Sequence, residues 1–286
     1  MGRSTENTPS VVAHGARLEK LAGGFDFTEG PTCDANGDVF FTDQPNDRIL
    51  KWSADGNLST FLEPAGRANG MCFEPGGHLI ACADEKNELW SIDAYGTVRV
   101  LVNTYAGSPL NGPNDVWVRP DGGIYFTDPF YKRSWWTHDT MPQDGQHVYF
   151  LPPDRQQLAR VADDLVKPNG IIGTPDGKTL YVADIDAGKT YRYDSAPDGR
   201  LSGKTLAADH GSDGMTLDDE GNLYLTGGGV AVFDRTGRLI ERILVPDEQW
   251  TANVGFGGKD RRMLFITASR GLYRVRMRVT GANSAK

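Results

Sequence analysis

The chain has 286 residues, a length that one all-β barrel or propeller can use in full, so we expect a single domain. Its 35 glycines, 16 prolines and hydrophobic content of 38% favour many short strands joined by turns over a helical bundle. The net charge of −8 argues against nucleic-acid binding, for which a basic stripe is typical.

The first residues and the cysteines exclude further classes. Residues 1–15 show no signal peptide, and no later segment has the roughly 20 apolar residues of a membrane span. We therefore expect a cytoplasmic protein with no membrane partner, a flexible segment at 1–15 and a flexible tail at 280–286. Cys33, Cys72 and Cys82 lack metal-type spacing and are odd in number, which predicts free thiols.

A short pattern recurs along the chain and predicts the fold. Each copy has an apolar strand, a turn rich in Asp, Asn, Pro and Gly, and a second strand of β-branched and aromatic residues, as in "NDVWVRPDGGIYFTD". Successive copies start 40 to 55 residues apart, which is typical of four-stranded propeller blades. The copies start at Glu29, Asn69, Asn114, Asn169, Asp213 and Asn253.

The repeat therefore predicts an all-β, six-bladed β-propeller at 16–279 with four-stranded blades. The last copy is one strand short, whereas the chain begins with a strand-like "ARLEKLAGG" at 16–24. We expect this N-terminal strand to complete the sixth blade and close the ring. The third copy carries an aromatic-rich insertion at 129–146, whose Trp135 and Trp136 either pack the loop down or line a substrate mouth.

All six starting residues carry a side-chain oxygen. Because the innermost strands of a propeller face the channel, these residues should ring its axis. Asn and Asp also favour turns, but Glu29 does not, so we favour a ring that binds a cation. Oxygen ligands without His or Cys predict Ca²⁺ before Mg²⁺ and argue against zinc. An aspartate also ends the second strand in four copies, and it either orients the ligands or forms a turn. These residues are Asp43, Asp84, Asp128 and Asp184.

Four blade starts together resemble the SMP-30/gluconolactonase/luciferin-regenerating-enzyme (LRE)-like family, and the likeness extends from about residue 17 to 278. They are "EGP" at Glu29, "PND" at Asn114, "KPNG" at Asn169 and "DGM" at Asp213. The resemblance implies one catalytic divalent ion held by these four residues. It also implies a small-molecule lactone as partner, and thus a calcium-dependent, gluconolactonase-like carboxylic ester hydrolase. Zn²⁺, Mn²⁺ or Mg²⁺ are alternative ions.

Many members of that family carry a basic residue shortly before the Pro-Asn-Asp motif, whereas this chain has "GSPLNGPND". Asn111 is the expected substitute as a substrate contact, and Lys132 or Arg133 in the insertion are alternatives for the missing cation. The predicted substrate-binding residues are Asn111, Asn114, Trp135 and His138.

Hydrolysis of a lactone needs a polarised carbonyl and an activated water. Ca²⁺ would polarise the carbonyl while Asp213 acts as general base, and a role for Asp213 as covalent nucleophile stays open. A serine nucleophile elbow, a P-loop and a dinucleotide fingerprint are all missing from the sequence. Two alternative functions stay open: an organophosphate hydrolase (phosphotriesterase) on the same ion, and a non-catalytic calcium-binding or interaction propeller. We expect a monomer or weak homo-oligomer.

Overall fold

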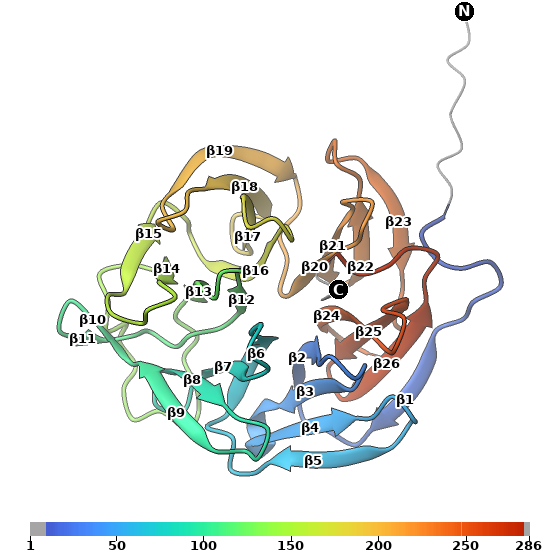
Figure 1. Ribbon diagram of the computed structural model, residues 1–286, viewed down its shortest axis with the longest axis horizontal. Helices are drawn as coiled ribbons and strands as arrows, with labels where there is room; N and C mark the ends of the chain where they lie inside the picture. Colours follow the sequence, from blue (N-terminus) through green and yellow to red (C-terminus); the bar gives the residue numbers. More distant parts are fainter. Residues whose placement is uncertain (1–9, 247, 283–286) are drawn as a thin grey trace, which may run out of the picture.

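The computed structural model describes residues 10–246 and 248–282, which form a β-propeller of six antiparallel four-stranded sheets around a central axis (Figure 1). Among these residues the helical structure is one 3₁₀ turn, Gln44–Asn46. They include no helix that is long and apolar enough to cross a membrane. The predicted all-β, six-bladed architecture is thus confirmed.

Five blades follow one another along the chain, each numbered from its innermost strand outward. The first two contain β2 (Thr28–Cys33), β3 (Val39–Asp43), β4 (Arg48–Trp52) and β5 (Leu58–Leu62), then β6 (Ala68–Phe73), β7 (Leu79–Ala83), β8 (Glu88–Ile92) and β9 (Val98–Val102). After a small hairpin of β10 (Thr104–Tyr105) and β11 (Ser108–Pro109), the third contains β12 (Val116–Val118), β13 (Ile124–Asp128), β14 (His147–Leu151) and β15 (Ala159–Ala162). The fourth and fifth contain β16 (Pro168–Gly173), β17 (Thr179–Asp184), β18 (Lys189–Ser195) and β19 (Leu201–Ala208), then β20 (Met215–Leu217), β21 (Leu223–Gly227), β22 (Gly229–Phe233) and β23 (Leu239–Ile243).

The sixth blade joins the two ends of the chain. It contains β24 (Thr251–Gly257), β25 (Met263–Ala268), β26 (Gly271–Arg276) and, as its outer strand, the N-terminal β1 (Glu19–Gly23) (Figure 1). Strand β1 pairs antiparallel with β26, from Glu19 opposite Arg274 to Gly23 opposite Gly271. The pairing is the one that the sequence predicts, because the last copy of the repeat lacks its fourth strand.

Packing extends beyond the predicted limits of the propeller. Val11 is 1% exposed within an apolar cluster, and Val12 forms a bridge with Met277. At the other end, Gly281 forms a bridge with Asp218. Residues 1–9 and 283–286 of the two predicted flexible segments lie outside the described residues.

Second strands are buried on both faces because each sheet packs between two neighbouring blades. The five residues of β3 and the five of β13 are all buried. A threonine near the end of three second strands ties its blade to the next. Thr42 Oγ1 donates to Asn69 O (3.3 Å), Thr127 Oγ1 to Asn169 O (2.7 Å) and Thr226 Oγ1 to Ala252 O (2.8 Å). These bonds fix neighbouring inner strands at one depth along the axis.

Deleting residues 1–24 should destabilise the propeller, because it removes β1 and the burial of Val11. Full burial of a valine contributes about 2 kcal/mol, so with the lost β1 pairing we expect Tm to fall by at least about 5 °C. Calorimetric melting measures the change. Deletion of residues 1–9 is the control, because it leaves Val11 and β1 in place. An unchanged melting transition after the longer deletion would show that β1 is dispensable for closing the ring.

Candidate active site

The six inner strands approach one another most closely where they start. Gly70 N donates to Asn114 O (2.8 Å) in the next blade, and Gly214 N donates to Ala252 O (2.7 Å). A Cβ atom at Gly30 would collide with the carbonyl of Asn69 in the next blade. The glycine after a ring residue therefore serves close packing between blades, and the side chain before it is held at the axis.

Glu29 is a buried carboxylate in this ring, 2% exposed. Its Oε2 accepts hydrogen bonds from Gly30 N (2.9 Å) and from Nδ2 of Asn253 (3.1 Å) in the neighbouring sixth blade. Burial, and then the negative charge of Asp213, raise the pKa of Glu29 well above its usual range. The site therefore disfavours a second negative charge unless a cation is present.

Asp213 and Asn169 lie together at the start of the fifth and fourth blades. Trp250 Nε1 donates to Asp213 Oδ2 (2.6 Å), and Asn169 Nδ2 donates to the hydroxyl of Tyr131 (2.8 Å). Burial raises the pKa of Asp213 to about 6, while the bonds from Trp250 and Asn169 act in the opposite direction. Asp213 remains partly accessible to solvent, unlike Glu29.

Asn114 completes the predicted ligand set at the start of the third blade. It is 5% exposed, and its side chain forms no hydrogen bond with the described residues, so its amide oxygen is not engaged elsewhere. No three His, Cys, Asp or Glu side chains gather in a metal-holding group among residues 10–246 and 248–282. The ring offers two carboxylates and two carboxamides instead. These hard oxygen donors, with the unbalanced charge of Glu29 and Asp213, fit a divalent cation such as Ca²⁺.

Three of the four aspartates that end second strands hold the backbone that leads into the ring. Each of these aspartates is at most 2% exposed. Each accepts hydrogen bonds from the backbone N–H groups of two consecutive residues that lie shortly before an inner strand. Asp43 Oδ1 accepts from Asp26 N (3.0 Å) and Phe27 N (3.3 Å), Asp128 from Asn111 N (2.9 Å) and Gly112 N (2.8 Å), and Asp184 from Val166 N (2.8 Å) and Lys167 N (2.9 Å). They orient the ring residues through the backbone and not by direct contact.

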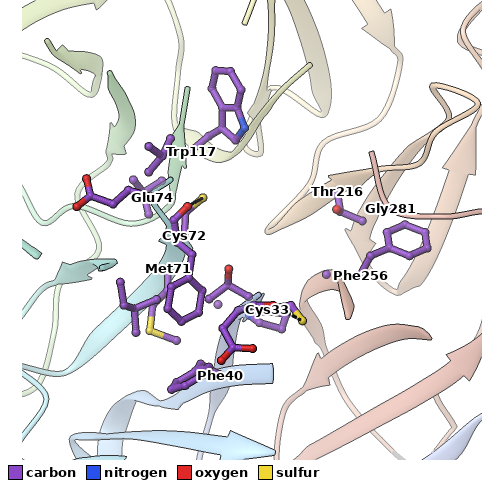
Figure 2. A pocket seen from close by; sticks show the side chains of 18 of the residues that line it. Cys33, Phe40, Met71, Cys72, Glu74, Trp117, Thr216, Phe256 and Gly281 are labelled. Carbon is purple, nitrogen blue, oxygen red and sulfur yellow. Dashed lines mark hydrogen bonds between the residues drawn. The ribbon is translucent and has the colours of Figure 1, made fainter. Parts of the chain in front are cut away.

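Asp115 is a third carboxylate near the axis. Its oxygens accept hydrogen bonds from Val116 N (3.0 Å) and Ile171 N (3.4 Å), and burial raises its pKa to about 7. Asp115 and Asn253 also line a cavity of about 870 Å³ that follows the inner strands away from the ring. Figure 2 shows Met71 and Cys72 among the side chains around this cavity. None of the four predicted ligands lines it, so the cavity meets the ring at Asn253 and at Asp115, which follows the ring residue Asn114.

The residues expected to contact substrate lie in or under the insertion. Asn111 is fully buried, with Nδ2 donating to Asp128 O (3.0 Å) and Gly145 O (2.8 Å), so in this conformation it has no exposed surface to offer. Trp135 Nε1 donates to Asp84 Oδ1 (3.1 Å), which packs the loop onto the second blade. His138 stacks on Trp136 with ring centroids 4.9 Å apart. Substrate contact by Trp135 and His138 stays a prediction.

Sequence reasoning did not identify two residues that contact the ring. Tyr131 lies in the insertion, where only its aromatic character was visible. Trp250 lies in the loop between β23 and β24, at a position for which the repeat gives no signal. Asp115 was visible in the "PND" motif, but its neighbour Asn114 alone was assigned a role.

Comparison with known proteins shows the family to which the chain belongs. Residues 27–270 match the SMP-30/Gluconolactonase/LRE-like region. The gluconolactonase of Zymomonas mobilis is 30% identical, over 98% of this chain and 88% of that protein. The 6-deoxy-6-sulfogluconolactonase of Pseudomonas putida is 29% identical, over 76% of this chain and 73% of its own length. A solved gluconolactonase structure from Xanthomonas campestris has a TM-score of 0.87 and 32% identity, with 93% and 91% of the two chains covered. The chain belongs to the SMP-30/gluconolactonase/LRE-like family.

Proposed function

We propose that this protein is a metal-dependent hydrolase of sugar lactones such as glucono-1,5-lactone. One observation carries the proposal: the buried Glu29 and the partly accessible Asp213 share the channel ring with the carboxamides of Asn114 and Asn169. Burial, and then the charge of Asp213, raise the pKa of Glu29, so the pair favours a bound cation. The full-length likeness to a gluconolactonase supports the choice of substrate.

Glu29, Asn114, Asn169 and Asp213 would hold the ion, for which Ca²⁺ is our first choice. When bound, the ion supplies Lewis-acid chemistry that polarises a carbonyl and stabilises the developing oxyanion. Asn169 is oriented for its part by the hydroxyl of Tyr131, to which its amide nitrogen donates. Glu29 is fixed by Asn253, so neither ligand has to be reorganised when the ion binds.

Asp213 would act as the general base. Trp250 holds Oδ2 through a 2.6 Å hydrogen bond, which fixes the plane of the carboxylate and leaves Oδ1 to accept a proton from water. Without a metal ion, burial raises the pKa of Asp213 to about 6, so most of this group is ionised at neutral pH, and a bound cation would favour the ionised form further. The hydroxide so formed attacks the carbonyl carbon, the bond between that carbon and the ring oxygen breaks, and Asp213 returns the proton to the leaving oxygen. The product is the open hydroxy acid.

Glu29→Gln should weaken cation binding at least about tenfold, because the variant keeps the shape of the ligand and removes one of two negative charges. Calorimetric titration of the metal-free protein with Ca²⁺ measures the affinity. Asn69→Ala is the matched control, since Asn69 occupies an equivalent ring position outside the ligand set. Equal Ca²⁺ affinities in wild type and Glu29→Gln would remove Glu29 from the ligands.

Asp213→Asn should lose about 10²–10⁴-fold in kcat at saturating metal, because an amide keeps an oxygen for the ion but cannot take a proton. Hydrolysis of glucono-1,5-lactone, and of an organophosphate triester in parallel, is followed before and after chelation. Asn114→Ala is the control, because it removes a ligand but no base, and excess metal should restore more of its activity. Near wild-type turnover in metal-saturated Asp213→Asn would place the base elsewhere.

A further inference from the structure

Asp84 ends the second strand of its blade as Asp43, Asp128 and Asp184 do, but it has different partners. Its Oδ2 accepts hydrogen bonds from Arg133 Nε (2.7 Å) and Gln44 Nε2 (3.0 Å). Its Oδ1 accepts one from Trp135 Nε1 (3.1 Å), and its backbone oxygen accepts one from Trp136 Nε1 (2.8 Å). The carboxylate that would hold the entry to the ring in the second blade therefore holds the insertion at 129–146 instead.

The contact with Asp84 fixes Arg133 but leaves two of its guanidinium nitrogens available for other hydrogen bonds. Only Nε is bonded to Asp84, and Nη1 and Nη2 form no hydrogen bond within residues 10–246 and 248–282. The side chain is 19% exposed, so these two nitrogens are reachable from solvent. The guanidinium carbon lies 5.3 Å from the ring centroid of Tyr131 and 5.6 Å from that of Trp135, between two aromatic rings of its own loop.

Arg133 lies next to the ring. Tyr131, over which it stacks, bonds directly to Asn169. Lys132, the preceding residue, is exposed, and none of its side-chain contacts with the described residues is an ion pair or hydrogen bond. Of the two cations in this stretch, Arg133 alone faces the site.

We propose that Arg133, positioned by Asp84, binds the substrate at the channel mouth through its two free Nη groups. The inference rests on the proposed lactone hydrolysis and names the recognition element of that site. An anchored, planar guanidinium presents paired N–H donors to oxygen acceptors, and it matches a carboxylate best. It therefore recognises the oxygens of a polyhydroxy lactone and, more tightly, the carboxylate of the product acid. Because Asp84 holds the fork in place beforehand, little side-chain freedom is lost on binding.

Arg133→Ala should raise KM for glucono-1,5-lactone at least about tenfold and leave kcat within about threefold, because a charge-assisted hydrogen bond to substrate is lost while the base remains. The affinity for D-gluconate, measured by calorimetry, should fall by a similar factor. Lys132→Ala is the matched control, since it removes the same charge one residue away and should leave both values unchanged. Arg133→Lys keeps the charge but not the fork, and should recover only part of the affinity.

Asp84→Asn tests the positioning role separately. It should raise KM in the same direction as Arg133→Ala and expose the bond after Arg133 to trypsin, with the Ca²⁺ affinity unchanged. If Asp84→Asn does not fold, as judged by melting, Arg133→Ala and Lys132→Ala decide alone. Equal KM and gluconate affinity in those two variants would overturn the proposal. A wild-type protein that binds gluconate through Arg133 but hydrolyses no lactone would refute the proposed function and leave the binding role intact.

Discussion

The close approach of the six inner strands at the channel axis is the constraint on which the rest of the structure depends. At Gly70 and Gly214 the backbone N–H meets a carbonyl of the next blade, and at Gly30 and Gly170 the next blade's carbonyl occupies the space of a Cβ. Only glycine fits such steps. Because the strands cannot slide past one another, the side chains just before these glycines are held at one depth. The Glu-Gly, Asn-Gly and Asp-Gly pairs are thus packing elements and ring positions at once.

That packing brings negative charge together where water is largely excluded. Burial is the largest cause of the raised pKa of Glu29, Asp115 and Asp213, and the charge of Asp213 adds to it at the other two. Three carboxylates in such surroundings cannot all ionise cheaply without a positive partner. A divalent ion at the ring would offset this repulsion for Glu29 and Asp213. Arg133 acts in the same sense, since its charge opposes the rise that burial causes in the pKa of Asp213.

The fold and the positions of the ring residues could be predicted from the sequence because both follow from a pattern that repeats six times. Strand alternation recurs in every copy and a glycine follows the ring residue in four of the six, so the depth of Glu29 or Asn169 follows once the blades are counted. Trp250, Tyr131 and the partners of Asp84 lie in loops outside the repeated strands, so the repeat does not predict them. Asn111 lies before the Pro-Asn-Asp motif, and for that reason it was predicted to contact the substrate. In the structure its side-chain amide instead donates a hydrogen bond to the insertion at Gly145 O.

The insertion also makes the surroundings of the ring asymmetric. Six similar blades present similar oxygens around the axis, whereas a lactone has one carbonyl and an asymmetric set of hydroxyl groups. Orientation must come from residues that break the repeat: Tyr131 and Arg133 from the third blade's insertion, held by Asp84 of the second, and Trp250 between the fifth and sixth blades. Asp84 could take this role because Arg133, Trp135 and Gln44 satisfy a carboxylate that is 1% exposed. A buried carboxylate with three donors is stable in that position, and its charge fixes Arg133 beside Tyr131.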